Sequence, residues 1–222
     1  MITKFVKLGR ICARLSCRPV VLAAGMPRSS STLLYNIVRE VLEEKWHDGL
    51  SYCWTRDVLN TPRGRAYLIK THSLGRLYRL RASHSFYSYR DIRVATVSAY
   101  RMFGWPISIE RMRRQVIEYR IARKFCNTCF SYENLISSPR SVVQKVSEQL
   151  SIPVDTDHIV SKVEKLAIPE SGPDYCRKTQ LHIGHFTHTG DDDWRSIIPV
   201  ELQDRIHREF SWWFRECGYP TK

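Results

Sequence analysis

The chain is 222 residues long and carries 35 lysines and arginines against 22 acidic residues, a formal net charge of +13. Its length predicts one domain over residues 1–222 with a core at about 19–217, because single cores keep growing up to about 250 residues. Hydrophobic residues make up 43% of the chain and no repeat occurs, which argues against a disordered or solenoid protein. The charge favours anionic partners without choosing among nucleic acid, membranes, glycans and charged cofactors.

The cysteines indicate a reducing compartment, because there are seven of them at irregular spacing and no disulfide framework is visible. Cys126 and Cys129 form a C-x-x-C pair. Zinc would require a second pair at matching spacing, so two small buried hydrophobic side chains are favoured over redox or metal chemistry.

The early apolar segment is too short to cross a membrane. Its uncharged run from Pro19 to Pro27 has nine residues, whereas a membrane span requires about 20. The segment also lacks the apolar core of a secretory signal. We therefore expect a soluble, cytoplasmic protein without a membrane span.

Strands and helices alternate along the chain. Apolar, β-branched or aromatic runs predict four strands, over residues 19–24, 66–70, 84–90 and 125–132. Apolar stripes and capping residues predict a helix that begins near Ser30, helices that begin after Asp91 and Ser138, and others over 107–124, 157–166 and 199–217. Gly218 is the expected stop of the last helix. Residues 169–193 read as a long loop.

This alternation predicts the α/β class, a single domain with a central parallel sheet flanked by helices. In such sheets, ligands bind beyond the carboxyl ends of the strands. Polar segments follow three of the predicted strands, at residues 25–32, at residues 70–72 and at Arg90. We expect the functional site where these segments converge.

The first of these segments, PRSSST, lies where a strand gives way to a helix. The free N–H groups and positive dipole of a helix N-terminus suit a phosphate-like anion. More donors come from the side chains of Arg28, Ser29, Ser30, Ser31 and Thr32. A Walker A loop would have Gly and Lys where Ser30 and Ser31 stand, so this loop is not of the kinase or ATPase kind. A serine-rich cap before an ordinary helix is the simpler alternative.

The other two segments carry groups suited to a transfer reaction. Lys70 can stabilise negative charge that develops on a bridging oxygen. His72 can take a proton from an attacking hydroxyl, since its pKa ordinarily lies near neutrality. A solvated Lys-His pair at a strand end is the alternative. Arg90 and Ser98 can together hold a second phosphate.

These segments resemble those of the sulfotransferases that use 3′-phosphoadenosine 5′-phosphosulfate (PAPS). PRSSST resembles the 5′-phosphosulfate loop P-[KR]-S-G-T-T, and KTH resembles the catalytic Lys-Thr-His. YRDIRVATVSAY is similar to R-[DN]-P-[RK]-D-x-x-x-S-x-Y, with the same eight-residue interval between Arg and Ser. FSYENL is similar to the Y-E-D-L strand end, and GDDDWRSIIP to G-D-W-[KR]. The matches occur in the family's order and cover residues 20–199.

The resemblance implies a P-loop-like sulfotransferase fold and a site for each part of PAPS. Arg28 would contact the phosphosulfate, and the 5′-phosphate would be held by Ser29, Ser30, Ser31 and Thr32. Arg90 and Ser98 would hold the 3′-phosphate, and Tyr132 would lie near the adenosine. PAPS would leave as the 3′,5′-bisphosphate (PAP), and no metal would be required.

The resemblance also implies the reaction, an in-line displacement in which an acceptor hydroxyl or amine attacks sulfur. His72 would be the general base, and Lys70 and Arg28 would stabilise the leaving oxygen. The acceptor would be a small molecule, a glycan or a peptide. Seven basic residues between Arg101 and Lys124, against two glutamates, could attract an anionic acceptor or simply form a solvated helix face.

Three departures from the family pattern stand out. Ser30 replaces the usual glycine, and Leu33 stands where a tryptophan would stack on adenine. The C-terminal R-K-G is absent, and Arg177 or Lys178 could supply its charge. The long loop also carries the repeated histidines and adjacent aspartates of HIGHFTHTGDDD, which favour a solvated turn over a metal site.

Two other function classes are left open by the sequence. A nucleic-acid or polyanion binder could use the basic residues, but this would leave Lys70 and His72 unexplained, so no stable nucleic-acid partner is expected. A nucleotide kinase could share the fold, but the phosphate loop lacks the Gly-Lys that a kinase requires.

Overall fold

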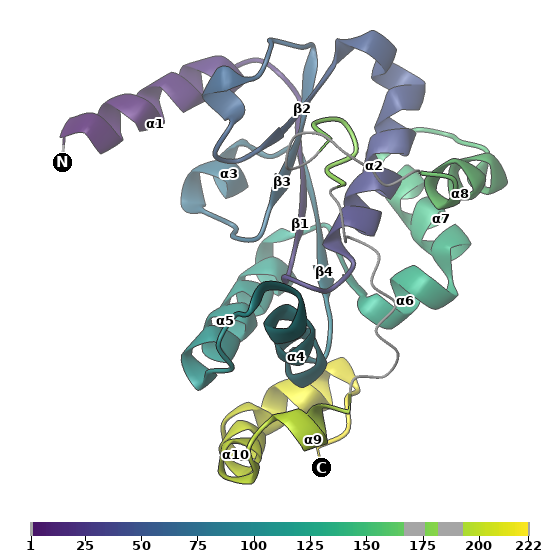
Figure 1. Ribbon diagram of the computed structural model, residues 1–222. Coiled ribbons are helices and arrows are strands. Elements are labelled where there is room, and N and C mark those ends of the chain that lie inside the picture. The colour runs from purple at the N-terminus through teal and green to yellow at the C-terminus, as the bar shows by residue number, and fades with distance from the viewer. Residues whose placement is uncertain (1, 167–175, 182–192, 222) are drawn as a thin grey trace.

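The structure, a computed structural model, describes residues 2–166, 176–181 and 193–221, with only the backbone for residues 2–5 and 7. Its centre is a five-stranded sheet in the order β2-β3-β1-β4-β5, with every neighbouring pair parallel (Figure 1). The strands are β1 (Val20–Gly25), β2 (Leu50–Trp54), β3 (Ala66–Thr71), β4 (His84–Tyr89) and β5 (Thr128–Ser131). The predicted α/β class with a central parallel sheet is confirmed.

Helices pack on both sides of this sheet (Figure 1). In chain order they are α1 (Ile2–Leu15), α2 (Ser31–Trp46), α3 (Arg76–Arg81), α4 (Ile92–Phe103), α5 (Ile109–Phe125), α6 (Tyr132–Ser137), α7 (Pro139–Leu150), α8 (Thr156–Glu164), α9 (Trp194–Ile197) and α10 (Val200–Cys217). Two short 3₁₀ turns, η1 (His47–Gly49) and η2 (Val58–Asn60), flank β2.

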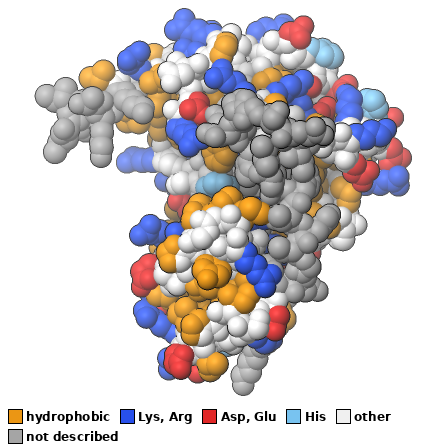
Figure 2. Space-filling view, viewed as in Figure 1, with side chains coloured by type: hydrophobic (Ala, Val, Ile, Leu, Met, Phe, Trp, Pro, Cys, Tyr) orange, Lys and Arg blue, Asp and Glu red, His pale blue; other side chains and the backbone are white. Residues whose placement is uncertain are grey.

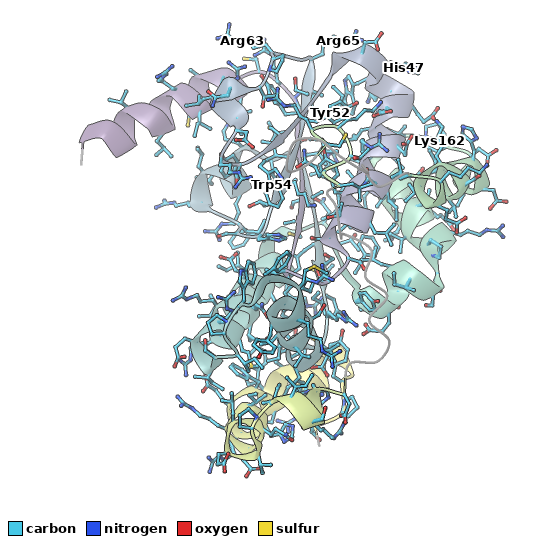
Figure 3. All side chains as sticks on the ribbon, in the orientation of Figure 1. His47, Tyr52, Trp54, Arg63, Arg65 and Lys162 are labelled. Carbon is cyan, nitrogen blue, oxygen red and sulfur yellow. The ribbon has the colours of Figure 1, made fainter. Side chains whose placement is uncertain are left out.

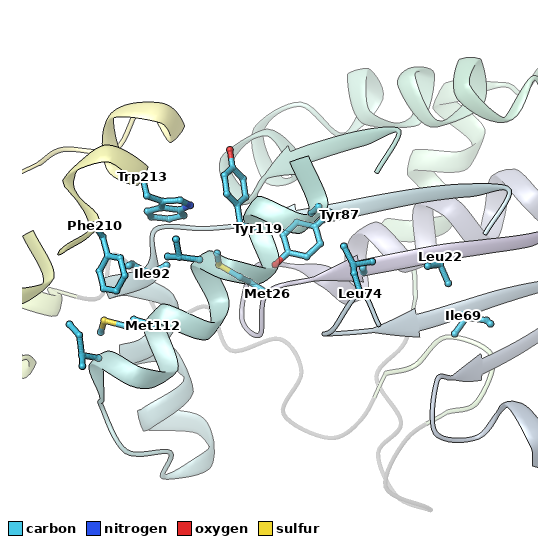
Figure 4. Packing of buried hydrophobic residues seen from close by; sticks show 14 of the residues in the cluster. Leu22, Met26, Ile69, Leu74, Tyr87, Ile92, Met112, Tyr119, Phe210 and Trp213 are labelled. Atoms are coloured by element: carbon cyan, nitrogen blue, oxygen red, sulfur yellow. The ribbon is translucent and has the colours of Figure 1, made fainter. Parts of the chain in front are cut away.

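Alternate residues of each central strand enter two separate hydrophobic clusters. Val21 and Ala23 of β1 face the cluster formed with α2, α7 and α8. Leu22 of β1 faces the opposite cluster, which Ile11 and Leu15 of α1 and residues of α5 and α10 complete. Figure 4 shows this second cluster, in which strand side chains meet aromatic residues of α5 and α10. Burial on both faces explains why β1, the middle strand, is wholly apolar.

The four predicted strands are present, but the last is shorter than predicted. The prediction of residues 125–132 was wrong at both ends, because helices occupy them. α5 extends to Phe125, and the Cys126 N–H still donates to the Ala122 carbonyl. At the other end the Ser131 hydroxyl accepts the Asn134 N–H at 3.1 Å, so Tyr132 begins a helix. Cys126 and Cys129 pack against the core, and burial raises the pKa of their thiols to about 11 and about 12.

Several predicted helix ends are confirmed. Asp91 accepts the Arg93 N–H at 2.9 Å at the start of α4, and Gly218 ends α10 with a φ of 74°. Pro139 opens α7 with Ser138 as its N-cap. Most of the predicted loop over residues 169–193 lies outside the described residues, including its histidines and the first two of the three adjacent aspartates at 191–193. The third, Asp193, caps α9 by accepting the Arg195 N–H at 3.2 Å.

Arg93 fixes α4, the helix that carries Ser98, against the C-terminal helices. Its side chain is 1% exposed and bonds both carboxylate oxygens of Asp91. It also donates to the Pro220 carbonyl at 2.7 Å, and its guanidinium lies 4.1 Å from the ring of Phe214. Because a buried guanidinium is costly unless it is paired, this contact holds α4 and α10 together.

In the described part of the chain, no helix combines the length and the apolar character that crossing a membrane requires.

Candidate active site

The strand register brings the predicted site segments to one edge of the sheet. Ala24 pairs with Thr71, Gly25 with Ser88, and Tyr89 with Ser131. All of these pairs lie at the carboxyl ends of parallel strands. The residues that follow them are 26–32, His72, Arg90 and Tyr132, and they therefore emerge side by side.

The loop between β1 and α2 is held in an unusual backbone conformation. Arg28 and Ser30 both have left-handed φ values, 65° and 57°. A Cβ on Gly25 would lie 2.1 Å from the Ser88 hydroxyl, so the loop runs close against β4. Left-handed residues that alternate with others turn successive N–H groups toward one point, which makes an anion-binding concavity. A loop of this conformation can hold a phosphate group, but phosphate binding at this loop stays a prediction.

The hydroxyls of the loop divide into two groups. Ser29 is fully buried, and its hydroxyl lies 2.7 Å from both the Met26 carbonyl and the Ser88 hydroxyl, so it braces the loop against β4. Ser31 and Thr32 begin α2, and the Thr32 hydroxyl accepts a hydrogen bond from Lys70. The predicted phosphate contact of Ser29 remains a prediction, since its hydroxyl already has protein partners.

Ser30 has a left-handed backbone conformation, which glycine adopts without a steric penalty. Left-handed φ costs a residue with a Cβ about 1–2 kcal/mol, whereas glycine pays about 0.5–1 kcal/mol in chain entropy. We therefore expect Ser30→Gly to raise the free energy of unfolding by up to about 1 kcal/mol. Urea denaturation measures this change. Ser31→Gly, one residue inside α2, is the control and should be destabilising; a loss of stability in both variants would contradict the strain at Ser30.

Lys70 lies beneath this loop, almost completely buried at 1% exposure. Its ammonium lies 5.1 Å from the ring of Trp54 and 5.8 Å from that of Tyr35. Burial lowers the pKa of Lys70 to about 7, because a charged ammonium loses its hydration there. An anion bound at the loop would restore the charge.

His72 is held in one tautomer. Its Nδ1 lies 2.7 Å from the Gly25 carbonyl. A carbonyl can only accept, so Nδ1 carries the proton and Nε2 keeps its lone pair. Burial lowers the pKa of His72 to about 4; the Gly25 bond opposes this shift and the Lys70 charge adds to it. At neutral pH the imidazole is therefore neutral and able to accept a proton at Nε2.

Trp54 is a site residue that the sequence analysis missed. It pairs with Lys70 across β2 and β3, and its ring meets that of His72 edge-on at 5.2 Å between centroids. Figure 3 shows Trp54 well away from Arg63 and Arg65, which lie in the segment between β2 and β3. The signal was the run LSYCW, which was not recognised as a strand, so its last residue was not assigned to the edge where the strands end.

Four of the predicted donor-binding residues lie together beside the loop. The Arg28 Nε donates to the Ser98 hydroxyl at 3.0 Å. Arg90 contacts the Arg28 carbonyl at 3.5 Å, and its guanidinium lies 3.8 Å from the ring of Tyr132. The Arg90 guanidinium therefore lies beside the backbone of the loop, and a guanidinium is a group suited to a phosphate.

An apolar surface adjoins Arg28. The Arg28 guanidinium lies 5.8 Å from the ring of Phe103, whose neighbour Trp105 is 4.9 Å away between ring centroids. Phe103 is 42% exposed and Tyr100 is 48% exposed. Hydrophobic side chains accordingly gather on the surface over α4 (Figure 2). This surface lies next to the loop and can contact a molecule that approaches it.

Two of the departures from the family pattern can be located. Leu33 packs against the cluster under α2. Lys178 pairs with Glu43 at 3.2 Å. Glu43 lies about 18 Å along α2 from Ser31, at 1.5 Å per residue, so Lys178 does not supply the missing charge at the loop.

The fold of the chain is similar to that of solved structures that include a sulfotransferase. Retinol dehydratase in complex with retinol and PAP is similar to this chain with a TM-score of 0.58 and 12% identity, over 92% of this chain and 83% of that one. The same enzyme with androsterone and PAP gives a TM-score of 0.56 at 12% identity, over 92% and 83%. Mouse sulfotransferase SULT7A1 complexed with PAP gives 0.56 at 14% identity, over 93% and 89%. No protein-family profile and no curated protein sequence matches the chain.

Proposed function

We propose that this protein is a sulfotransferase that moves a sulfuryl group from PAPS to a hydroxyl or amine of an acceptor. The observation that carries the proposal is the contact between Lys70 and Thr32 of the loop, beside a His72 whose Nε2 is a proton acceptor. The structural neighbours were solved with PAP, the product that PAPS leaves behind, which supports the choice of donor.

The donor would be held by two groups of residues. The loop 26–32 would take the 5′-phosphate through its backbone N–H groups and the hydroxyls at the start of α2. Arg90 and Ser98 would take the 3′-phosphate, with Tyr132 near the adenosine. The left-handed residues of the loop and the Arg90 guanidinium beside its backbone fit these two anions.

When bound, PAPS supplies an activated sulfuryl group. The protein would position that group, stabilise the charge on the leaving oxygen and accept the proton of the acceptor. His72 would accept the proton of the acceptor at Nε2, while the Gly25 carbonyl holds the ring through Nδ1. Lys70 and Arg28 would stabilise the oxygen from which the sulfuryl group departs. The acceptor would be a small molecule, a glycan or a peptide that enters next to the apolar surface of Tyr100 and Phe103.

Donor binding should be coupled to protonation of Lys70. Its pKa of about 7 leaves it largely neutral at pH 8, and a bound phosphate raises that pKa. We expect PAP binding to take up a proton at pH 8 and none below about pH 6, where Lys70 is already charged. Calorimetry in buffers of different ionisation enthalpy measures the uptake. Lys70→Met should abolish it; an unchanged uptake in that variant would remove Lys70 from the binding site.

Transfer of labelled sulfate from PAPS to a panel of hydroxyl- and amine-bearing acceptors tests the proposed activity. Thermal denaturation with PAP, ATP and an oligonucleotide tests the alternatives. A ligand at 100 times its Kd adds about 2.7 kcal/mol to the free energy of unfolding, so a bound ligand raises the melting temperature. Stabilisation by PAP alone supports the sulfotransferase. Stabilisation by ATP would favour a kinase, and a steeply salt-dependent oligonucleotide affinity would favour a nucleic-acid binder.

A further inference from the structure

Helix α1 extends away from the body of the protein (Figure 1). Its second half is anchored, because Ile11 is 7% exposed and Leu15 is fully buried in the core. Arg81 of α3 also donates to the Leu15 carbonyl at 2.8 Å. Further toward its free end, Val6 is 56% exposed and Leu8 is 45% exposed. The described part of the chain thus leaves aliphatic side chains of α1 in contact with water.

The charge of this region has a single sign. The first acidic residue of the sequence is Glu40, so α1 carries four basic residues and no acidic one. Helix α3, which packs against α1, adds three arginines and again no acid. Its Leu80 is 73% exposed. Two adjacent helices therefore combine seven basic residues with three exposed aliphatic side chains.

This combination restricts what can cover the two helices. Exposed aliphatic side chains favour a partner that offers an apolar environment. A second copy of the same surface is disfavoured, because it would bring seven more positive charges to the contact. A layer of anionic lipids offers negative headgroups above an apolar interior, and basic amphipathic helices bind such layers in the plane of the interface.

We propose that α1 and α3 form a docking surface for membranes that contain anionic lipids. The exposed side chains Val6, Leu8 and Leu80 enter the boundary between headgroups and acyl chains. The exposed Arg10 of α1 and Arg76 of α3 lie at the phosphate level. The contact is peripheral, since α1 has 14 residues and a spanning helix requires about 20.

Co-sedimentation of the full chain with lipid vesicles tests the proposal. Phosphatidylcholine vesicles with phosphatidylserine should bind the protein, and pure phosphatidylcholine vesicles should bind it at least about tenfold more weakly. The double variant Arg10→Gln/Arg76→Gln should weaken binding to the anionic vesicles by about 25-fold, since one basic residue contributes about fivefold near such a surface. Val6→Ser/Leu8→Ser should weaken it by at least about tenfold, because two apolar side chains are lost from the contact. Added salt should weaken the wild type.

Matched controls separate the surface from general charge and hydrophobicity. Arg114→Gln/Arg120→Gln removes two exposed charges from α5, and Val200→Ser removes an exposed aliphatic side chain from α10. Both should bind vesicles like the wild type, and every variant should keep the same circular dichroism. Equal loss in the controls, or binding that does not depend on phosphatidylserine, would overturn the proposal. Binding to soluble polyglutamate is a further check. If the protein binds polyglutamate as tightly as it binds the anionic vesicles, and Val6→Ser/Leu8→Ser does not weaken that binding, an acidic protein would be the better partner and the proposal would be overturned.

Discussion

Replacing His72 with alanine is expected to lower the rate of sulfuryl transfer by about 10²–10⁴-fold while PAP affinity stays nearly constant. The reason is local, since Nε2 keeps its lone pair while Nδ1 bonds the Gly25 carbonyl, and Nε2 is the proposed proton acceptor. Initial rates with labelled PAPS and calorimetry with PAP measure the two quantities on one preparation. His158→Ala, an exposed histidine of α8, is the matched control and should leave both unchanged.

The outcome that would contradict this role is equally definite. Turnover near that of the wild type in His72→Ala would remove the imidazole from the mechanism. Loss of PAP affinity in parallel with rate would instead indicate that the ring supports the loop through the Gly25 carbonyl. His72→Gln separates the cases further, because its amide can donate to that carbonyl without acting as a base at neutral pH.

The pH profile gives an independent check on the same side chain. Burial lowers the pKa of His72 to about 4, so the neutral form persists well below the usual range of histidine. Since only the neutral form accepts a proton, the rate attributable to His72 should hold as the pH falls to about 5 and decline below that. A decline centred near pH 6.5 would mean that the imidazole is solvated. The profile should be recorded at saturating donor, so that Lys70 stays protonated throughout.

Replacing Arg90 with glutamine is expected to weaken PAP binding by at least about 30-fold, because loss of one partner from a buried charge pair costs about 2–5 kcal/mol. The guanidinium is 9% exposed and stacked on Tyr132, so it is already held in place before the ligand arrives. Calorimetric titration with PAP measures the loss. Arg114→Gln, on the exposed side of α5, removes the same charge from a distant position and should have little effect.

Comparison of two ligands tells whether Arg90 contacts the 3′-phosphate in particular. Adenosine 5′-monophosphate lacks that group, so wild-type protein should prefer PAP strongly, and Arg90→Gln should lose most of this preference. Its affinity for the monophosphate should change little. If PAP and the monophosphate are weakened by the same factor, Arg90 acts through the loop, whose Arg28 carbonyl it contacts, and its 3′-phosphate role is contradicted.

The pattern of apolar and polar residues in the sequence predicted β1, the loop after it and α2, which together form the centre of the candidate site. The apolar run of β1, the hydroxyl-rich loop and the stripe of α2 each have a distinct periodicity, so their order and type could be read directly. Parallel pairing then required their neighbours to end at the same edge, which brought Lys70, His72 and Arg90 to the loop. These steps needed only local pattern and the handedness of strand connections.

The remaining features depend on tertiary contacts that local pattern does not encode. β2 is an edge strand whose mixed run LSYCW lacks a clear alternation, so Trp54 could not be assigned to the site. The substitution at Ser30 was visible, but its left-handed backbone was not. The inward bonds of Ser29 to β4 and the pairing of Lys178 with Glu43 likewise join residues far apart in the chain.

A crystal structure with PAP bound tests the central claim most directly, namely that the turn after β1 grips a nucleotide carrying two phosphates. We expect the 5′-phosphate within residues 26–32 with the Lys70 ammonium beside it, and the 3′-phosphate on Arg90 and Ser98. We also expect Nε2 of His72 to face the position where sulfur would stand. PAP bound at another edge of the sheet, or an imidazole turned away from the 5′-phosphate, would contradict the account.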